Sequence, residues 1–229
     1  MKNIKLILII LSIAFSSCKE ENQIKPHQVK INVELQHKLE SILTKDQGIR
    51  EIINGNLSEE RKAEILLKLN LKKMDIEGNR KFKLMHEIDS INLVESEEII
   101  KNYGYPSKLL VGEPANKAIY YVIQHSDKIE EYLPLIREAT ANGDLSKTSL
   151  ALMEDRNLMN QGLEQIYGTQ IKGQANKKGE WIYFLWPIKN FDSVNTWRSQ
   201  VGFEQNLEEY LKDMDVEFKI YALKDLKKL

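Results

Sequence analysis

The sequence is poor in cysteine and has no excess of charge of either sign. Cys18 is the only cysteine in 229 residues, so an intrachain disulfide is excluded. Lysine and arginine total 33 and aspartate and glutamate total 34, which gives a formal net charge of −1. Because nucleic-acid-binding domains usually carry a basic face or stripe, we expect no nucleic acid among the partners. A hydrophobic content of 42% is ample for a packed core.

Short motifs that identify common catalytic and metal sites are also missing. The sequence contains no phosphate-binding glycine loop, no Gly-x-Ser-x-Gly elbow, no Cys–His pairing and no His-Glu-x-x-His. His125 and Asp127 have a spacing that offers two metal ligands, but no third ligand follows at a recognisable spacing. We therefore predict a site with no metal and no cofactor.

The N-terminus has the pattern of a bacterial lipoprotein signal. Lys2 and Lys5 precede an apolar run over residues 6–15, which is typical of a signal peptide and short for a membrane span. The run ends in Phe-Ser-Ser before Cys18, which resembles a lipobox although phenylalanine replaces the usual leucine. We predict a signal peptide over residues 1–17 and a lipid on Cys18 that attaches the protein to a membrane. The alternative is an ordinary secretory signal followed by a chance cysteine.

The residues after Cys18 suggest a cellular location. Lys19, Glu20 and Glu21 resemble the surface-export signal of lipoproteins from some Bacteroidota. The following residues are polar and include Pro26, so residues 18–30 are predicted to be the lipidated cysteine and its tether. These features predict a lipid-anchored protein of the cell envelope, on the outer membrane and exposed at the cell surface.

Hydrophobic spacing beyond the tether predicts a mainly α fold of the α+β class. Helices are predicted over residues 31–53, from Ser58 to a break at 78–79, onward to about Val94, again from Ser96, after Pro114, and over 128–141, 146–166, 192–200 and 205–213. An aromatic and β-branched run at 180–188 predicts a β-hairpin with residues 167–172, and residues 216–223 are a further candidate strand. We predict one helical domain over 31–229 with a small sheet near its C-terminus.

Polar groups occupy the apolar stripes of four predicted helices. At about 100° per residue, these groups are Asp46 with Arg50, Asp89 with Asn92, His125, and Asp155 with Arg156. A buried unpaired carboxylate costs several kcal/mol, so these groups need partners, and the simplest partners are one another. One interpretation is a ligand or catalytic pocket. The other is a buried ion-pair network that only stabilises or specifies the fold.

Two short motifs add hydrogen-bonding groups to this set. Gln124, His125 and Asp127 end one predicted helix, and histidine is the side chain most easily used for proton transfer near neutral pH. The segment after the Asp155 helix carries the polar side chains Gln165, Tyr167, Thr169 and Gln170 at one helix–strand corner. We predict Gln124, Asp127 and these four as ligand-binding residues, with structural capping as the alternative.

Several of these motifs occur together in a known family. The segments GYP, QHSD, ALMEDRNLM and QIYGTQ, in this order, resemble a family of bacterial proteins classed as a domain of unknown function. The resemblance extends from Asp46-Gln47-x-x-Arg50 through Asp89-x-x-Asn92 to Arg198-x-x-x-Gly202, which is most of the predicted mature chain. It implies no particular activity, but it includes the residues that the helical-wheel test selects.

The aromatic residues of the predicted hairpin have two interpretations. Trp181, Tyr183, Phe184 and Trp186 lie in a strand with two apolar faces, which favours core packing. At a cell surface the same residues would also suit stacking against a sugar. Trp197 and Arg198, after the hairpin, are expected to close the pocket or to pack on it.

These observations lead to three functional hypotheses. In the first, His125 is a general acid or base, and Asp127 or Asp155 orients it. Arg156 and the Gln and Thr side chains then hold an anionic or carbonyl oxygen of the substrate, and the reaction is a hydrolysis or transfer. In the second, the protein is a non-catalytic envelope module that binds a small molecule, peptide, glycan or protein. In the third, it is a structural lipoprotein. No nucleophile stands out from the sequence.

Overall fold

The structure is a computed structural model that describes residues 30–55 and 57–228. The predicted signal peptide (1–17), the predicted lipidation site Cys18 and all of the predicted tether except Lys30 lie outside the described residues. In the two described segments, none of the helices combines the length and the apolarity needed to cross a bilayer.

Helices make up most of the described chain, as the sequence predicts, and the mainly α fold class is confirmed. The α-helices are α1 Val33–Asn54, α2 Glu59–Leu69, α3 Arg80–Tyr103, α4 Lys108–Val111, α5 Ala118–Gln124, α6 Ile129–Ala141, α7 Lys147–Asn160, α8 Val194–Val201 and α9 Leu207–Asp213. Short 3₁₀ helices are η1 Lys73–Ile76, η2 Ala115–Lys117, η3 Phe191–Ser193 and η4 Leu223–Lys228. The strands are β1 Ile171–Ala175 and β2 Trp181–Leu185.

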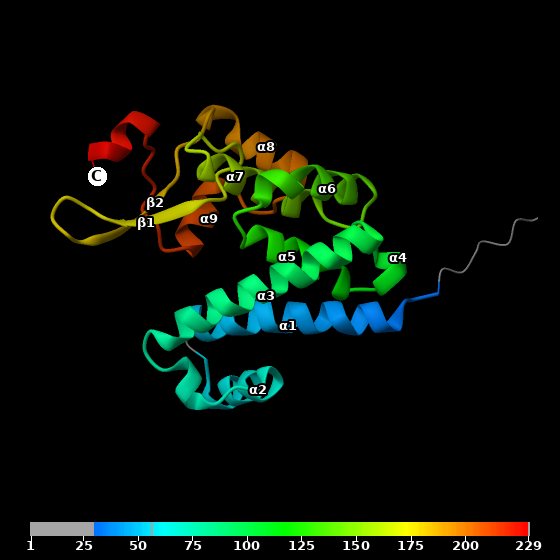
Figure 1. Ribbon diagram of the computed structural model, residues 1–229. Coiled ribbons are helices and arrows are strands. Elements are labelled where there is room, and N and C mark those ends of the chain that lie inside the picture. Colours follow the sequence, from blue (N-terminus) through cyan, green and yellow to red (C-terminus); the bar gives the residue numbers. More distant parts are fainter. Residues whose placement is uncertain (1–29, 56, 229) are drawn as a thin grey trace, which may run out of the picture.

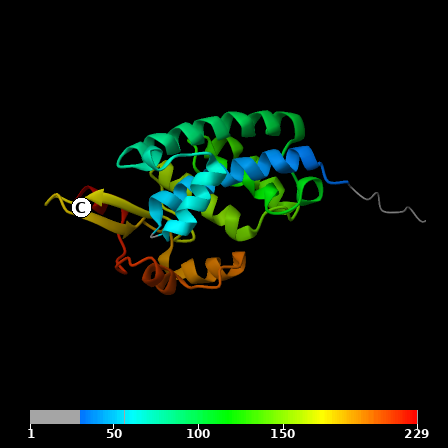
Figure 2. The ribbon, with the colours of Figure 1, turned by 90° about the horizontal axis from the view of Figure 1, so that it is seen from below.

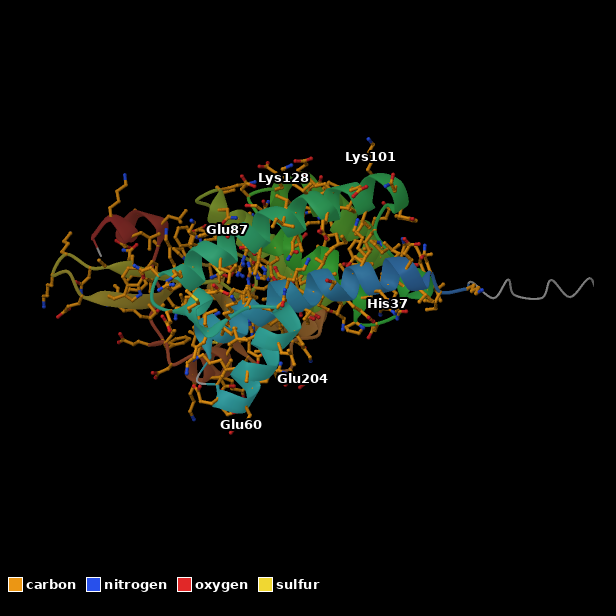
Figure 3. The ribbon with its side chains drawn as sticks, turned by 60° about the horizontal axis from the view of Figure 1, so that its bottom comes forward. His37, Glu60, Glu87, Lys101, Lys128 and Glu204 are labelled. Carbon is orange, nitrogen blue, oxygen red and sulfur yellow. The ribbon has the colours of Figure 1, made fainter. Side chains whose placement is uncertain are left out.

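The two longest helices, α1 and α3, lie side by side and form one layer of the molecule (Figures 1 and 2). The short α5 packs against both of them, and α6 and α7 cover α5. The main core lies between these elements and is made of buried aliphatic side chains such as Leu39, Ile99, Ile123, Ile136 and Met153. Polar side chains on the outer faces of the helices are turned to solvent, as Glu60 on α2 and Lys101 on α3 show (Figure 3).

A second, smaller core holds the C-terminal part together. It consists of Leu185, Ile188, Val194, Leu207, Leu211 and Val216, from β2, α8, α9 and their connections. Strands β1 and β2 are antiparallel, with Gly173 opposite Tyr183. The hairpin extends from one end of the molecule, and α1 begins at the opposite end (Figures 1 and 2).

Several predicted boundaries are wrong, among them the end of α2, which is Leu69 instead of a break at 78–79, and the first strand of the hairpin, which is 171–175 instead of 167–172. Helix α3 runs unbroken through Ser96, whose side chain is fully buried on the same face as Asn92 and Ile99, so Ser96 does not start a helix. Helix α7 ends at Asn160 instead of 166, because Gly162 adopts a positive φ of 71°. Residues 216–222 form no strand, and the sheet in the described chain consists of β1 and β2.

Candidate functional site

The carboxylate of Asp46, on α1, is the centre of the first polar cluster. It is 1% exposed and accepts hydrogen bonds from three side chains. Arg50 Nη1 lies 3.0 Å from Asp46 Oδ1, Gln47 Nε2 lies 2.6 Å from Oδ2, and His125 Nδ1 lies 3.1 Å from Oδ1. A carboxylate oxygen accepts hydrogen bonds, so we assign Nδ1 of His125 as the donor in this contact, and a neutral His125 then has its free lone pair on Nε2.

Arg50 connects this pair to α3. Its Nη2 lies 2.8 and 2.9 Å from the two carboxylate oxygens of Asp89, while Nη1 also donates to the main-chain oxygen of Asp46 at 2.9 Å. Arg50 therefore has two acidic partners and a fixed position. Asp89, Arg50, Asp46 and His125 thus form a chain of hydrogen bonds that links α3, α1 and the end of α5.

An open cleft of about 630 Å³ lies beside this chain. Helix α1, the first half of α3, the end of α5 and the end of α7 contribute its walls. The lining residues are Arg50, Ile53, Asn54, Phe82, Met85, His86, Asp89, Gln124, His125, Ser126, Arg156, Met159 and Asn160. The Ser126 hydroxyl is engaged, since it donates to Ile123 O at 2.9 Å and accepts from Lys128 N at 3.1 Å.

Arg156, on α7, also lines this cleft but has a different set of partners. Its Nε lies 3.2 Å from Gln170 Oε1 and its Nη1 lies 3.1 Å from the main-chain oxygen of Gln124. No carboxylate in the described chain forms an ion pair with it. Burial, together with the positive charge of Arg50, lowers the pKa of the Arg156 guanidinium.

Asp155 belongs to a second polar cluster, away from the cleft. Its side chain is fully buried, and both carboxylate oxygens bind the loop that follows α7, residues 161–170. The donors are the N–H groups of Ile166, Tyr167 and Thr169 and the hydroxyl of Thr169, at 2.7 to 3.1 Å. Burial raises the pKa of Asp155, and these donors oppose that rise.

Gln165 and two side chains from α8 and α9 hold the 161–170 loop by binding main-chain groups. Gln165 Nε2 donates to Trp186 O at 2.7 Å and Gln170 O at 3.1 Å, and Gln165 Oε1 accepts from Gln170 N at 2.8 Å. Arg198 Nη1 donates to Tyr167 O at 2.9 Å, and the Tyr210 hydroxyl donates to Thr169 O at 2.9 Å. Gln165, predicted from the sequence to bind a ligand, therefore stabilises the loop, together with Arg198 and Tyr210.

The structure thus divides the predicted site residues between two clusters. It brings Asp46, Arg50, Asp89, Gln124, His125 and Arg156 to the cleft. Asp155, Gln165, Tyr167, Thr169 and Gln170 lie in or against the 161–170 loop, and only Gln170 contacts a cleft residue, Arg156. Asn92 is fully buried, with its Nδ2 at 3.4 Å from Ile42 O and no partner at Oδ1.

The prediction that Asp127 or Asp155 orients His125 is wrong. Asp127 is exposed and Asp155 is occupied by the loop, so the carboxylate beside His125 is Asp46, 79 positions away in sequence. Sequence reasoning also missed the lining residues Phe82, His86 and Asn160. A helical pattern identifies which residues share a face, but it does not identify which faces meet across a cleft.

Within residues 30–55 and 57–228, no three His, Asp or Glu side chains are arranged to hold a metal ion.

Comparisons with known proteins give one match. A family model described as a family of unknown function, DUF6624, matches residues 33–224. No curated protein and no solved structure matches the chain.

Proposed function

The chain belongs to the DUF6624 family, whose function is unknown, and from this premise we propose that its cleft is an acid–base site for a hydrolysis or transfer reaction. His125 is the proposed proton-transfer residue. Asp46 is proposed to hold the His125 ring and to stabilise its protonated form. A cleft of about 630 Å³ is large enough for a small polar substrate.

The observation that carries this proposal is the Asp46–His125 contact at the wall of an open cleft. The Nδ1–Oδ1 distance of 3.1 Å leaves Nε2 as the nitrogen that can accept a proton, and no hydrogen bond to Nε2 forms within the described chain. The His125 side chain is 17% exposed, so solvent and small molecules reach it. Such a buried acid behind a partly exposed imidazole is the usual geometry of a general base.

The lining of the cleft restricts the reaction further. Ser126 is its only residue with an aliphatic hydroxyl, and that hydroxyl is used within the 123–128 turn. The nucleophile is then a water molecule or a hydroxyl of a second substrate, activated by His125 Nε2. This arrangement favours direct attack over a covalent intermediate on the protein.

We also propose that the protein is an envelope lipoprotein anchored through Cys18. Under this proposal, α1 begins near the membrane side. At a helical rise of about 1.5 Å per residue, Arg50 lies about 25 Å from Val33 along α1. The cleft would therefore open at a distance from the bilayer, where it can meet soluble substrates.

His125→Gln tests the acid–base proposal, with His37→Gln as the matched control. His37 is exposed on α1 and does not line the cleft. The probes are p-nitrophenyl acetate, p-nitrophenyl phosphate and bis-p-nitrophenyl phosphate. We expect turnover of at least one ester to fall about a hundredfold in His125→Gln and to be unchanged in His37→Gln, with melting temperatures preserved. Turnover that persists in His125→Gln, or no turnover of any ester, contradicts the proposal.

A second candidate function is glycan binding by the hairpin. Trp181 and Tyr183 are 64% and 63% exposed, although the sequence favours core packing for them. Their rings lie edge to face, with centroids 6.4 Å apart, on the face that carries Gly173. Aromatic faces of this kind stack against sugars, and the hairpin lies at the end opposite the start of α1 (Figure 1). Loss of binding to a glycan array in Trp181→Ala, with normal stability, would favour this function.

A further inference from the structure

Two arginines line the cleft, and their charges are compensated very differently. Arg50 is bonded to the carboxylates of Asp46 and Asp89. Arg156 has only neutral partners, the Gln170 amide oxygen and the Gln124 main-chain oxygen. Since burying a cation without an anion is costly, Arg156 is the member of the cleft whose charge lacks a counterion.

The Arg156 guanidinium is also fixed in position. Its Nε is held by Gln170 on one side and its Nη1 by Gln124 on the other. Its Nη2 makes no hydrogen bond within the described chain, and the residue lines the cleft. A guanidinium held in this way presents donors to a ligand without first losing side-chain freedom, which favours binding.

Arg198 is a useful comparison, because all of its contacts are with groups that stabilise the fold. It is 2% exposed, donates to Gln205 O and Tyr167 O, and lies against the rings of Phe203 and Tyr210. It has no carboxylate partner either, but cation–π contacts and carbonyl oxygens surround it. Arg156 has no such ring contacts in the described chain and faces open space instead.

We infer that Arg156 binds an oxyanion group of the ligand, a carboxylate or a phosphate, in the cleft beside His125. The inference rests on the proposed function only in that the Arg156 guanidinium and the His125 imidazole share one cleft. Guanidinium–oxyanion hydrogen bonds are among the strongest in proteins, and Nη1 and Nη2 of Arg156 lie on one edge of the group, as bidentate binding requires.

Titration with inorganic phosphate and with acetate, at constant ionic strength, tests this inference. The first measurement is the NMR signal of the Arg156 side-chain Nε–H in the unsubstituted protein, which needs no variant to fold. The second is the dissociation constant in Arg156→Gln and in Arg137→Gln. Arg137 is an equally charged control, because it lies on the surface and pairs with Glu154. We expect saturable binding that weakens about tenfold or more in Arg156→Gln and is unchanged in Arg137→Gln.

Phosphate binding alone would identify a tetrahedral group, and acetate binding alone a planar one. Failure of both anions to shift the Arg156 signal, or equal weakening in the two variants, would overturn the inference. The His125→Gln protein separates this result from the acid–base proposal. Anion binding that survives in a protein without ester turnover leaves Arg156 as a binding residue, whereas His125-dependent turnover without anion binding leaves only the acid–base proposal.

Discussion

The cleft beside His125 and the 161–170 loop both contain an aspartate bonded within a polar cluster, but the two aspartates bind different groups. Asp46 accepts hydrogen bonds from the side chains of Arg50, Gln47 and His125. Asp155 accepts them from three main-chain N–H groups and one hydroxyl. The first cluster lies at the wall of an open cleft, and the second is buried between α7, α8 and β2.

This difference separates a carboxylate that stabilises the fold from one that is able to assist chemistry. Main-chain N–H groups do not titrate, and those of the 161–170 loop have the Asp155 oxygens as their acceptors. An imidazole does titrate near neutral pH, and Asp46 has one as a partner. The partner of a buried carboxylate is thus more informative about function than its burial.

The largest effect is expected from Asp155→Ala. The substitution removes the acceptor of the N–H groups of Ile166, Tyr167 and Thr169 and leaves a cavity in place of a fully buried side chain, so the free energy of unfolding should fall by about 4 kcal/mol in urea denaturation. Glu154→Gln, one position earlier on α7, removes only a surface ion pair and should cost at most about 1 kcal/mol. A similar loss in both variants would show that the loop does not depend on Asp155.

A smaller effect is expected from Gly168→Ala in the same loop. Gly168 has a φ of 68°, and an added Cβ would lie 2.7 Å from Leu207 Cδ1, which requires the second core to move. We expect a loss of about 2–3 kcal/mol in unfolding free energy, measured by calorimetry. Gly162→Ala is the control, because its φ of 71° is similar but no atom lies within 4 Å of the added Cβ. An equal loss of unfolding free energy in the two variants would show that the positive φ alone, without the contact to Leu207, causes the effect.

His125→Gln should change stability by less than about 1 kcal/mol. Asp46 retains its bonds to Arg50 and Gln47, so no buried carboxylate is left unpaired. Thermal unfolding of this variant measures whether the cleft cluster serves the fold. A loss as large as that of Asp155→Ala would remove the distinction between the two clusters and support a structural role for both.

The smallest effect is expected at a surface pair that belongs to neither cluster. Lys128 and Tyr132 donate to Glu97, and the hydrogen bond from Lys128 is the main reason that the pKa of Glu97 is lowered from 4.5. Because the pKa is lowered in the folded state, this pair stabilises the protein above pH 4.5, and the stabilisation is lost as the pH falls below that value. Glu97→Gln should cost less than about 1 kcal/mol near neutral pH and nothing in acid, by urea denaturation at several pH values.

Much of the fold follows from local rules. Helical spacing predicted α1, α6, α8 and α9 closely, because each has an apolar stripe and three of the four have a capping side chain or a terminating glycine. The start of α2 was predicted from its cap at Ser58, but its end at Leu69 was not. The unbroken α3 and the early end of α7 were not predicted. Ser96 resembles a cap in sequence, and only the packing of α3 against α1 shows that it is buried within a helix.

The sequence by itself determined that Asp46, Asn92, His125 and Asp155 would lie on the inner faces of helices, because the direction of a side chain on a helix depends only on its position. Tertiary structure alone decided which of them meet. Asp155 and Arg156 are neighbours in sequence, yet one binds the 161–170 loop and the other lines the cleft. Successive helical side chains point about 100° apart, so adjacent residues face different neighbours, and those neighbours are set by how the helices pack.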